Sequence, residues 1–197
     1  DADPRVRASA LTGLGHIALQ RTLPTILRAA TDESALVRHA VAFALSSFGS
    51  VAEAQTCLLT LMRDPDADVR DWATFGLGQL SDADSTEIRD AFARLLDDPF
   101  IDVRVEAMAG LAKRRDARVV APLISQLENL PEGLTGVIEA GLAYIGMKEM
   151  PPGWTAQDLA GAVGKRQDRL AQGLVDTLAK RAGEPVERQK TRFGWHL

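Results

Sequence analysis

The sequence contains one cysteine, few aromatic residues and no long apolar segment, and each shortage excludes a class of protein. The single Cys57 permits no internal disulfide, so we expect a reducing compartment, the cytoplasm. No apolar run approaches the ~20 residues of a membrane span, and no signal peptide is visible. The formal net charge of −4 lacks the basic excess of a nucleic-acid-binding protein.

Charge is spread unevenly along the chain. Residues 1–147 carry 14 Lys/Arg and 21 Asp/Glu, a net charge of −7, and residues 148–197 carry 9 and 6, a net charge of +3. An acidic body with a mildly basic end does not favour a nucleic acid as partner. Because the sequence begins at Asp1 and not at Met, we expect a fragment whose targeting signal or preceding repeats are missing.

An internal repeat runs through residues 1–146. The units share an apolar position, taken here as zero, at spacings of 31, 32, 34 and 31 residues: Val6, Val37, Val69, Val103 and Leu134. Four residues after zero stands Ala, Val or Ile, seven after stands Gly or Ala, and eight after stands Leu. These offsets lie on one face of a helix. They predict an A helix in each unit, whose small residue at +7 lets a neighbouring helix approach closely.

A second apolar pattern precedes each zero position and predicts a B helix. Eleven residues before zero stand Ile26, Leu58, Phe92 and Leu123. Seven residues before zero stand Ala30, Met62, Leu96 and Leu127. Each unit is therefore an A helix, a turn, a B helix and a second turn. A lone hairpin cannot bury its apolar face, but stacked hairpins share a continuous core.

Two stretches of this repeat resemble a known family. They are Asp64–Arg70 (DPDADVR) and Asp98–Arg104 (DPFIDVR), each followed by Ala, Gly and Leu. They resemble HEAT repeats, in particular the short bacterial subtype named after phycobilisome lyases, and Arg118–Leu127 is similar to the second helix of that family. The resemblance covers about residues 1–146 and implies an all-α solenoid of about five helical-hairpin repeats. The fifth unit departs from the pattern at Asn129 and Thr135, as is typical of an end unit.

Acidic and basic residues recur at fixed positions around each zero position. Asp stands five residues before zero and Arg one after: Asp32, Asp64 and Asp98 with Arg38, Arg70 and Arg104. An Asp there can cap the A helix that follows. Such pairs are also compatible with acid–base chemistry or phosphate binding. However, the set recurs in every unit, whereas an active site is needed once. The resemblance to HEAT repeats implies a structural ladder that ties successive turns together.

The C-terminal residues leave the repeat pattern. Residues 147–183 are predicted to form a helical cap over the last repeat. Thr155 and Asp158 match a capping box, and one long helix or two follow, ending near Gly183. Residues 184–197 form a tail that either docks on a partner or is loose.

The outward side of the B helices is the first candidate binding surface. The offsets −16, −13 and −9 lie opposite the buried position −11. We call this surface the ridge, and its candidate residues are Arg21, Arg28, Thr60, Glu87, Asp90, Arg94, Arg118 and Ser125. Because both charge signs occur, the ridge suits a protein or peptide partner better than a nucleic acid. The alternative is a solvated face without a partner.

Aromatic residues on the A helices are the second candidate. Phe75 and Phe43 share the offset +6, and Trp72 lies one turn from Phe75. If exposed together they would form an apolar patch for a partner, and otherwise they fill the seams between units. Neither the histidines nor Cys57 show metal-ligand or catalytic spacing. We therefore predict no catalytic residue, no metal and no cofactor.

Three functions remain open at this point. The first is a non-enzymatic scaffold or adaptor that binds a protein or peptide through the ridge, and an uncovered first repeat would let it self-associate. The second, implied by the resemblance, is a bilin-lyase-like subunit that acts on a tetrapyrrole-carrying protein. The third is a nucleic-acid-binding enzyme built on HEAT-like repeats. The sequence favours the first, because of the repeat itself and because no catalytic set is present, although fold alone does not define a function.

Overall fold

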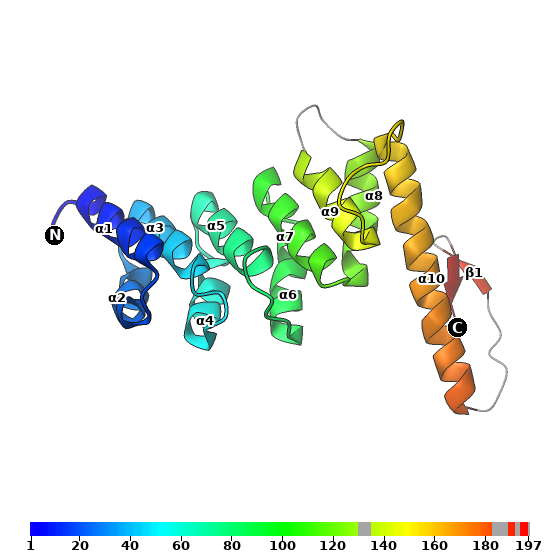
Figure 1. Cartoon of the computed structure of the whole chain (residues 1–197), viewed down its shortest axis with the longest axis horizontal. Coiled ribbons are helices and arrows are strands. Elements are labelled where there is room, and N and C mark those ends of the chain that lie inside the picture. The colour runs from blue at the N-terminus through cyan, green and yellow to red at the C-terminus, as the bar shows by residue number, and fades with distance from the viewer. Residues whose placement is uncertain (130–134, 183–188, 192–193, 197) are drawn as a thin grey trace. The chain divides into compact units, whose positions relative to one another are not determined.

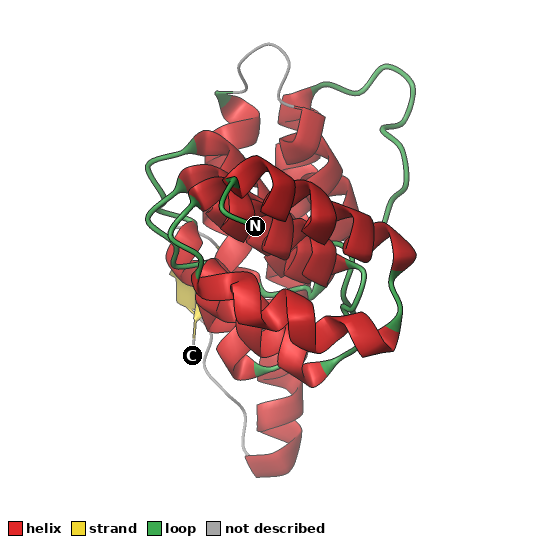
Figure 2. Ribbon diagram, turned by 90° about the vertical axis from the view of Figure 1, so that its left-hand side faces the viewer, coloured by secondary structure: helices red, strands yellow, loops and turns green. Residues whose placement is uncertain are grey.

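The structure, a computed structural model, describes residues 1–129, 135–182, 189–191 and 194–196. Its elements are almost entirely helices, which confirms the predicted all-α solenoid of helical hairpins (Figures 1 and 2). The chain divides into two compact units, Asp1–Asp116 and Ala117–Leu197. None of the described helices is long and apolar enough to cross a membrane.

The first unit consists of two layers of helices. The A helices form one layer in which each packs against the next: α1 (Pro4–Ile17), α3 (Ala35–Ser46), α5 (Ala67–Gly78) and α7 (Ile101–Lys113). The B helices lie along one side of that layer: α2 (Leu23–Arg28), α4 (Ala52–Leu61) and α6 (Thr86–Leu95) (Figure 1). Two 3-10 turns, Gln20–Thr22 and Ala29–Thr31, flank α2. This alternation is the one that the repeat predicts.

The A-helix face at offset zero is buried wherever an earlier repeat covers it. The exposed fractions of Val37, Val69 and Val103 are 0%, 0% and 1%. Val6 is 49% exposed, because none of the described helices covers this face of α1. Leu134, the fifth zero position, lies outside the described residues.

The B-helix core follows the position eleven residues before zero. All four residues there are fully buried: Ile26, Leu58, Phe92 and Leu123. The position seven residues before zero is less regular. Met62 and Leu127 are buried, whereas Ala30 and Leu96 are half-buried.

The second unit packs one long helix against two shorter ones. After the 3-10 turn Ala117–Val119 come α8 (Val120–Glu128), α9 (Thr135–Ile145) and α10 (Ala156–Ala182), and α10 contacts both α8 and α9. Two short strands, β1 (Gln189–Thr191) and β2 (Gly194–His196), pair antiparallel within the residues predicted as a tail. We did not predict these strands. The structure groups α8 and α9 with α10, whereas our predicted array extends to residue 146.

The start of α10 has the predicted capping box. The Thr155 N–H and Oγ1 both donate to Oδ2 of Asp158 at 2.7 Å, and the Asp158 N–H donates to Thr155 Oγ1 at 3.3 Å. Leu159 and Val163 are fully buried. Leu170 is 42% exposed, so the apolar face of α10 is buried in its first turns and exposed at Leu170.

Small residues let α1 and α3 approach closely, but not at the predicted position. A Cβ added at Gly13, at offset +7, would meet nothing within 4 Å. A Cβ added at Gly15, two residues on, would lie 2.7 Å from Cα of Ala44. The offset +7 is close-packed in later units, where a Cβ on Gly76 would lie 3.0 Å from Cβ of Ser46. The first repeat differs because none of the described helices packs against its +7 position.

The two glycines of α1 provide a matched test of this packing. We expect Gly15→Ala to lower the free energy of unfolding by about 1–3 kcal/mol, because the methyl group pushes α1 away from the backbone of α3. We expect Gly13→Ala to raise it by about 0.5–1 kcal/mol, because Ala favours a helix interior over Gly. Urea denaturation followed by circular dichroism measures both. Equal effects of the two substitutions would contradict the close contact at Gly15.

Candidate functional site

The repeated aspartates bind the turn before each A helix. The carboxylates of Asp32, Asp64 and Asp98 each accept a hydrogen bond of 3.0 Å from the backbone N–H two residues later. Helices α3, α5 and α7 begin three residues after these aspartates. Their N-cap residues are Ser34, Asp66 and Phe100. The prediction that the repeated aspartates cap the A helices is therefore wrong, because each lies too early in the chain.

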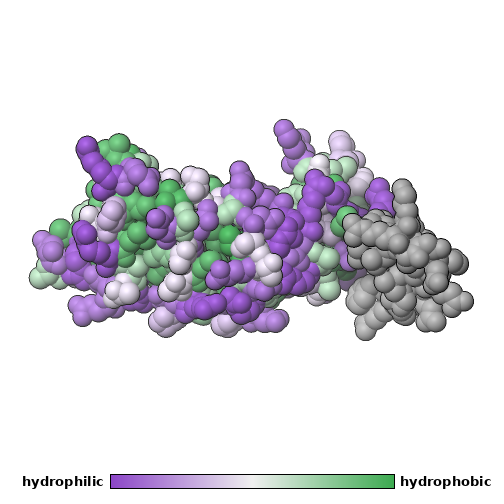
Figure 3. All heavy atoms as spheres, turned by 90° about the horizontal axis from the view of Figure 1, so that it is seen from below, coloured by the Kyte–Doolittle hydropathy of each residue, from purple (hydrophilic) through white to green (hydrophobic). Residues whose placement is uncertain are grey.

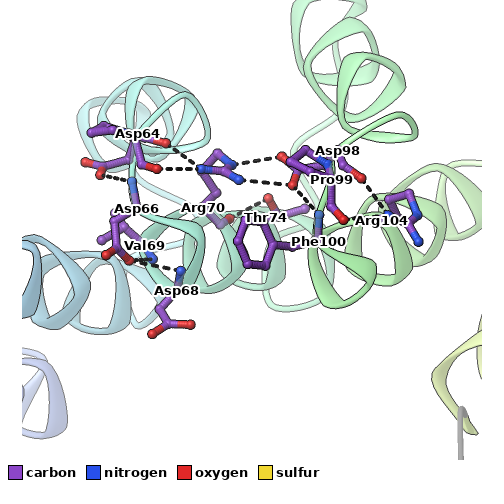
Figure 4. Close-up of polar contacts among 11 residues, drawn as sticks. Asp64, Asp66, Asp68, Val69, Arg70, Thr74, Asp98, Pro99, Phe100 and Arg104 are labelled. Atoms are coloured by element: carbon purple, nitrogen blue, oxygen red, sulfur yellow. Dashed lines mark hydrogen bonds and ion pairs between the residues drawn. The ribbon is translucent and has the colours of Figure 1, made fainter.

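Each repeated arginine joins its own repeat to the next one. The Arg70 guanidinium donates through Nε and Nη2 to both oxygens of Asp98, at 2.8 and 3.0 Å (Figure 4). Its Nη1 donates to the carbonyls of Asp64 and Pro65, in the turn before its own helix. Two earlier arginines repeat this arrangement: Arg38 with Asp64, and Arg7 with Asp32. Such two-pronged contacts are strong and directional.

Arg104, the last arginine of the series, binds the turn of its own repeat, but among the described residues it has no aspartate partner. Arg104 Nη1 donates to the carbonyls of Asp98 and Pro99, at 2.6 and 3.1 Å. Within the described part of the chain its guanidinium forms no ion pair. In the sequence the corresponding position of the next repeat is Asn129 and not Asp, and within the first unit the ladder of ion pairs ends at Asp98.

Hydrogen bonding keeps the ladder ionised despite its burial. Burial alone would raise the pKa of Asp64, but the hydrogen bonds from Arg38 and the Asp66 N–H outweigh it and leave that pKa below its usual range. The same balance lowers the pKa of Asp98, with Arg70 as the donor. The hydrogen bonds to these aspartates in turn raise the pKa of Arg38 and of Arg70. All four groups are charged at neutral pH, as a lasting ion pair requires.

The ridge lies at the surface, as its spacing predicts. In the first unit Asp90 is half-exposed, and the other candidate residues are exposed: Arg21, Arg28, Thr60, Glu87 and Arg94. Arg118 and Ser125 are also exposed but belong to the second unit. Viewed from the side of α2, α4 and α6, the first unit shows hydrophilic and apolar side chains intermixed (Figure 3). The structure thus brings six of the eight candidate residues onto one compact unit.

An open groove of about 390 Å³ lies between the end of α4 and α6. It is lined by Met62, Arg63, Arg70, Ala91, Arg94 and Leu95. Arg63 and Arg94 are exposed, and neither guanidinium has a hydrogen-bond or ion-pair partner among the described residues. The groove therefore combines an apolar floor with two available cations. Arg63 was not among the predicted site residues.

The aromatic candidates form a continuous row across three A helices. The rings of His16, Phe43, Trp72 and Phe75 contact one another edge to face, at centroid distances of 5.1, 5.3 and 5.5 Å along the row. The His39 ring also contacts the Trp72 ring edge to face, at a centroid distance of 5.6 Å. Phe43, Trp72 and Phe75 are half-buried. The row therefore fills seams between repeats and also reaches the surface, which lies between the two predicted alternatives.

Arg114 is a structural residue that the sequence analysis missed. Its buried guanidinium donates only to backbone carbonyls, including Leu77 and Gly78 at the end of α5 and Gly110 in α7. It also lies over the Phe92 ring, 4.9 Å from the centroid. Burial lowers the pKa of this guanidinium. The residue suits the negative ends of two helices, but it occurs in one unit only, so a comparison of repeats does not reveal it.

Two other side chains bear on possible chemistry. Burial raises the pKa of the Cys57 thiol to about 11, so the reactive thiolate is scarce at neutral pH. Burial also raises the pKa of Asp71 to about 6, and the charges of Asp102 and Asp68 add to the rise. Asp71 Oδ1 is buried and makes no hydrogen bond among the described residues. The same residues contain no group of three or more side chains that could hold a metal ion.

The ladder can be tested by comparing two of its arginines. We expect Arg70→Ala to lower the free energy of unfolding by about 3–5 kcal/mol, because it leaves the buried Asp98 carboxylate without its partner. We expect Arg104→Ala to cost about 1 kcal/mol, because only hydrogen bonds to turn carbonyls are lost. Urea denaturation of the two variants provides the comparison. A loss from Arg104→Ala as large as that from Arg70→Ala would contradict the role of the ion pair.

Comparisons with known proteins agree with this architecture. The family model described as HEAT repeats matches residues 1–78 and 55–143. Over 99 residues, 50% of this chain, the sequence is 40% identical to the protein YibA of Escherichia coli strain K12 and of Escherichia coli O157:H7. That match covers 35% of YibA.

A solved structure extends this likeness beyond the aligned sequence. The X-ray structure of Escherichia coli YibA matches 91% of this chain and 58% of the YibA chain, with a TM-score of 0.62 and 30% sequence identity. The chain therefore spans only part of the length of these relatives. Since the family model covers most of the residues and the helices follow its hairpins, the chain belongs to the HEAT repeat family.

Proposed function

We propose that this chain is a non-enzymatic scaffold that binds a protein or peptide through the ridge of its B helices. Stacked repeats present extended surfaces that relatives of this architecture use for binding. The ladder supports such a role, because ion pairs between successive repeats hold the B helices in fixed positions along the first unit. A surface held in this way loses little conformational entropy when a partner binds.

The groove between α4 and α6 is the observation that carries this proposal. Arg63 and Arg94 flank it without a partner among the described residues, whereas Arg38 and Arg70 are fully engaged in the ladder. A cation that no internal carboxylate neutralises is available to a partner. Binding hot spots are enriched in arginine beside apolar pockets.

The other predicted functions have no such support. No observation on the described residues favours the bilin-lyase-like or the nucleic-acid-binding alternative over a scaffold. The cytoplasm remains our proposed location. Self-association through the first repeat also stays a prediction, supported by the exposure of Val6 and by an apolar groove of about 240 Å³ that Val6, Ala10 and Leu14 line.

Affinity capture from a lysate of the source organism, followed by mass spectrometry, tests the ridge. The ridge variant carries Arg28→Glu and Arg94→Glu, and a control variant carries Lys148→Glu and Lys165→Glu, which make the same change in net charge at exposed positions of the second unit. We expect a protein that the native chain and the control retain and the ridge variant loses, because reversed charges repel the partner. Circular dichroism first confirms that all three chains are folded.

Two results would count against the proposal. Retention of the same protein by the ridge variant would place the binding surface elsewhere, with the aromatic row as the next candidate. If the native chain retains no protein at all, the scaffold function itself fails.

A further inference from the structure

The groove between α4 and α6 has features that define the chemistry of its occupant. Its floor is formed by Met62, Ala91 and Leu95, whose exposed fractions are only 2%, 3% and 8%, so the floor is apolar but offers little free surface. Its flanks are the exposed Arg63, just after α4, and Arg94, in the last turn of α6. The groove is open and not enclosed, so it admits a segment of chain more readily than it encloses a small molecule.

All the charged side chains that line the groove are positive. Its lining contains three arginines and no acidic residue. Arg70 is neutralised, because its guanidinium is bound to Asp98 and to two turn carbonyls. The guanidinium groups of Arg63 and Arg94 have no such partners among the described residues. Two uncompensated positive charges therefore stand beside an apolar surface.

Carboxylates fit these charges better than a phosphate chain does. Guanidinium groups bind carboxylates through two parallel hydrogen bonds, and the protein itself uses that contact three times in its ladder. A nucleic acid would bring many phosphates to residues 1–147, which carry a net charge of −7, and repulsion beyond the groove would oppose its binding. A short peptide with one or two carboxylates avoids that repulsion.

We infer that the groove between α4 and α6 binds an acidic peptide segment, with a Glu or Asp carboxylate between Arg63 and Arg94. The inference rests on the proposed function and specifies its partner. Both arginines also lie at the C-terminal ends of B helices, where positive charge is favourable without any ligand. A test must therefore measure binding and stability separately.

Fluorescence anisotropy with labelled peptides tests the inference directly. The probe is a short peptide that alternates Glu and Leu, and the comparison peptides replace every Glu by Gln or by Lys. We expect the full chain to bind the Glu peptide with a Kd below about 1 mM and to bind the Gln and Lys peptides at least tenfold more weakly, because they offer no carboxylate. Equal binding of the Glu and Gln peptides, or no binding of the Glu peptide, would overturn the inference.

Matched variants locate the site. We expect Arg63→Gln with Arg94→Gln to weaken binding of the Glu peptide about tenfold or more. The control pair Lys148→Gln and Lys165→Gln removes the same charge from exposed positions of the second unit, outside the ridge and the groove, and we expect it to change binding less than about twofold. Equal losses from both pairs would indicate attraction by net charge alone and would overturn the groove as the site.

Two further measurements show which part of the proposal is wrong if the expected binding is not observed. The first measures binding of a single-stranded oligonucleotide to the native chain and to the variant with Arg63→Gln and Arg94→Gln. If the oligonucleotide binds the native chain more tightly than the Glu peptide does and loses binding in that variant, a peptide is not the occupant of the groove. The second is urea denaturation, which should show that the variant with Arg63→Gln and Arg94→Gln unfolds at a slightly lower urea concentration than the native chain and is fully folded without urea, so that lost binding reflects lost contacts. If the Glu peptide fails while a captured protein still depends on the ridge, the scaffold function stands and this inference falls.

Discussion

The structure depends on one constraint: each repeat must hold its neighbour at a fixed distance and angle, because none can bury its apolar face alone. Apolar packing at Val37, Val69 and Val103 supplies most of the attraction, but it is not directional. The ion pairs from Arg38 and Arg70 to the next repeat supply direction, since each guanidinium engages both oxygens of its partner. Each arginine also binds the turn of its own repeat, so one side chain positions two turns at once.

Arginine has two distinct roles in this chain, and the hydrogen bonds that each guanidinium forms show which role it has. In the ladder, and at Arg114, every guanidinium is directed into the protein, toward carboxylates or the carbonyls at helix ends. At Arg63 and Arg94 the guanidinium groups are directed to neither. The first role explains how the repeats stay in register. The second provides the chemical basis for a binding surface on the same helices.

Much of the fold could be predicted because it repeats. The period located the A and B helices of the first unit, the buried positions at zero and −11, and the exposed side of the B helices. The role of the repeated aspartates was mistaken, because each helix begins two residues later than a cap at the aspartate would require, and the carboxylates bind the preceding turn. Arg114 and Arg63 were missed because neither recurs from unit to unit, and a repeat reveals only what its units share.

Terminal effects account for the remaining differences. Gly13 shares its position with Gly76, but none of the described helices packs against it, so its space is open and the close approach lies at Gly15. The position of Arg104 resembles that of Arg70, but within the first unit the ladder ends at Asp98, and in the sequence the next repeat has Asn129 and not Asp. A periodic pattern cannot show where a periodic set of contacts ends, and the three-dimensional structure does.

The central claim is that partners bind on the B helices. Hydrogen exchange of the chain, alone and with the protein that it captures, tests this most directly because exchange reports on each helix separately. Our account predicts that the partner slows exchange in α4 and α6, around Arg63 and Arg94, and leaves α3 and α5 unchanged. Slower exchange confined to α3 and α5, with α4 and α6 unaffected, would contradict it and place the partner on the A helices.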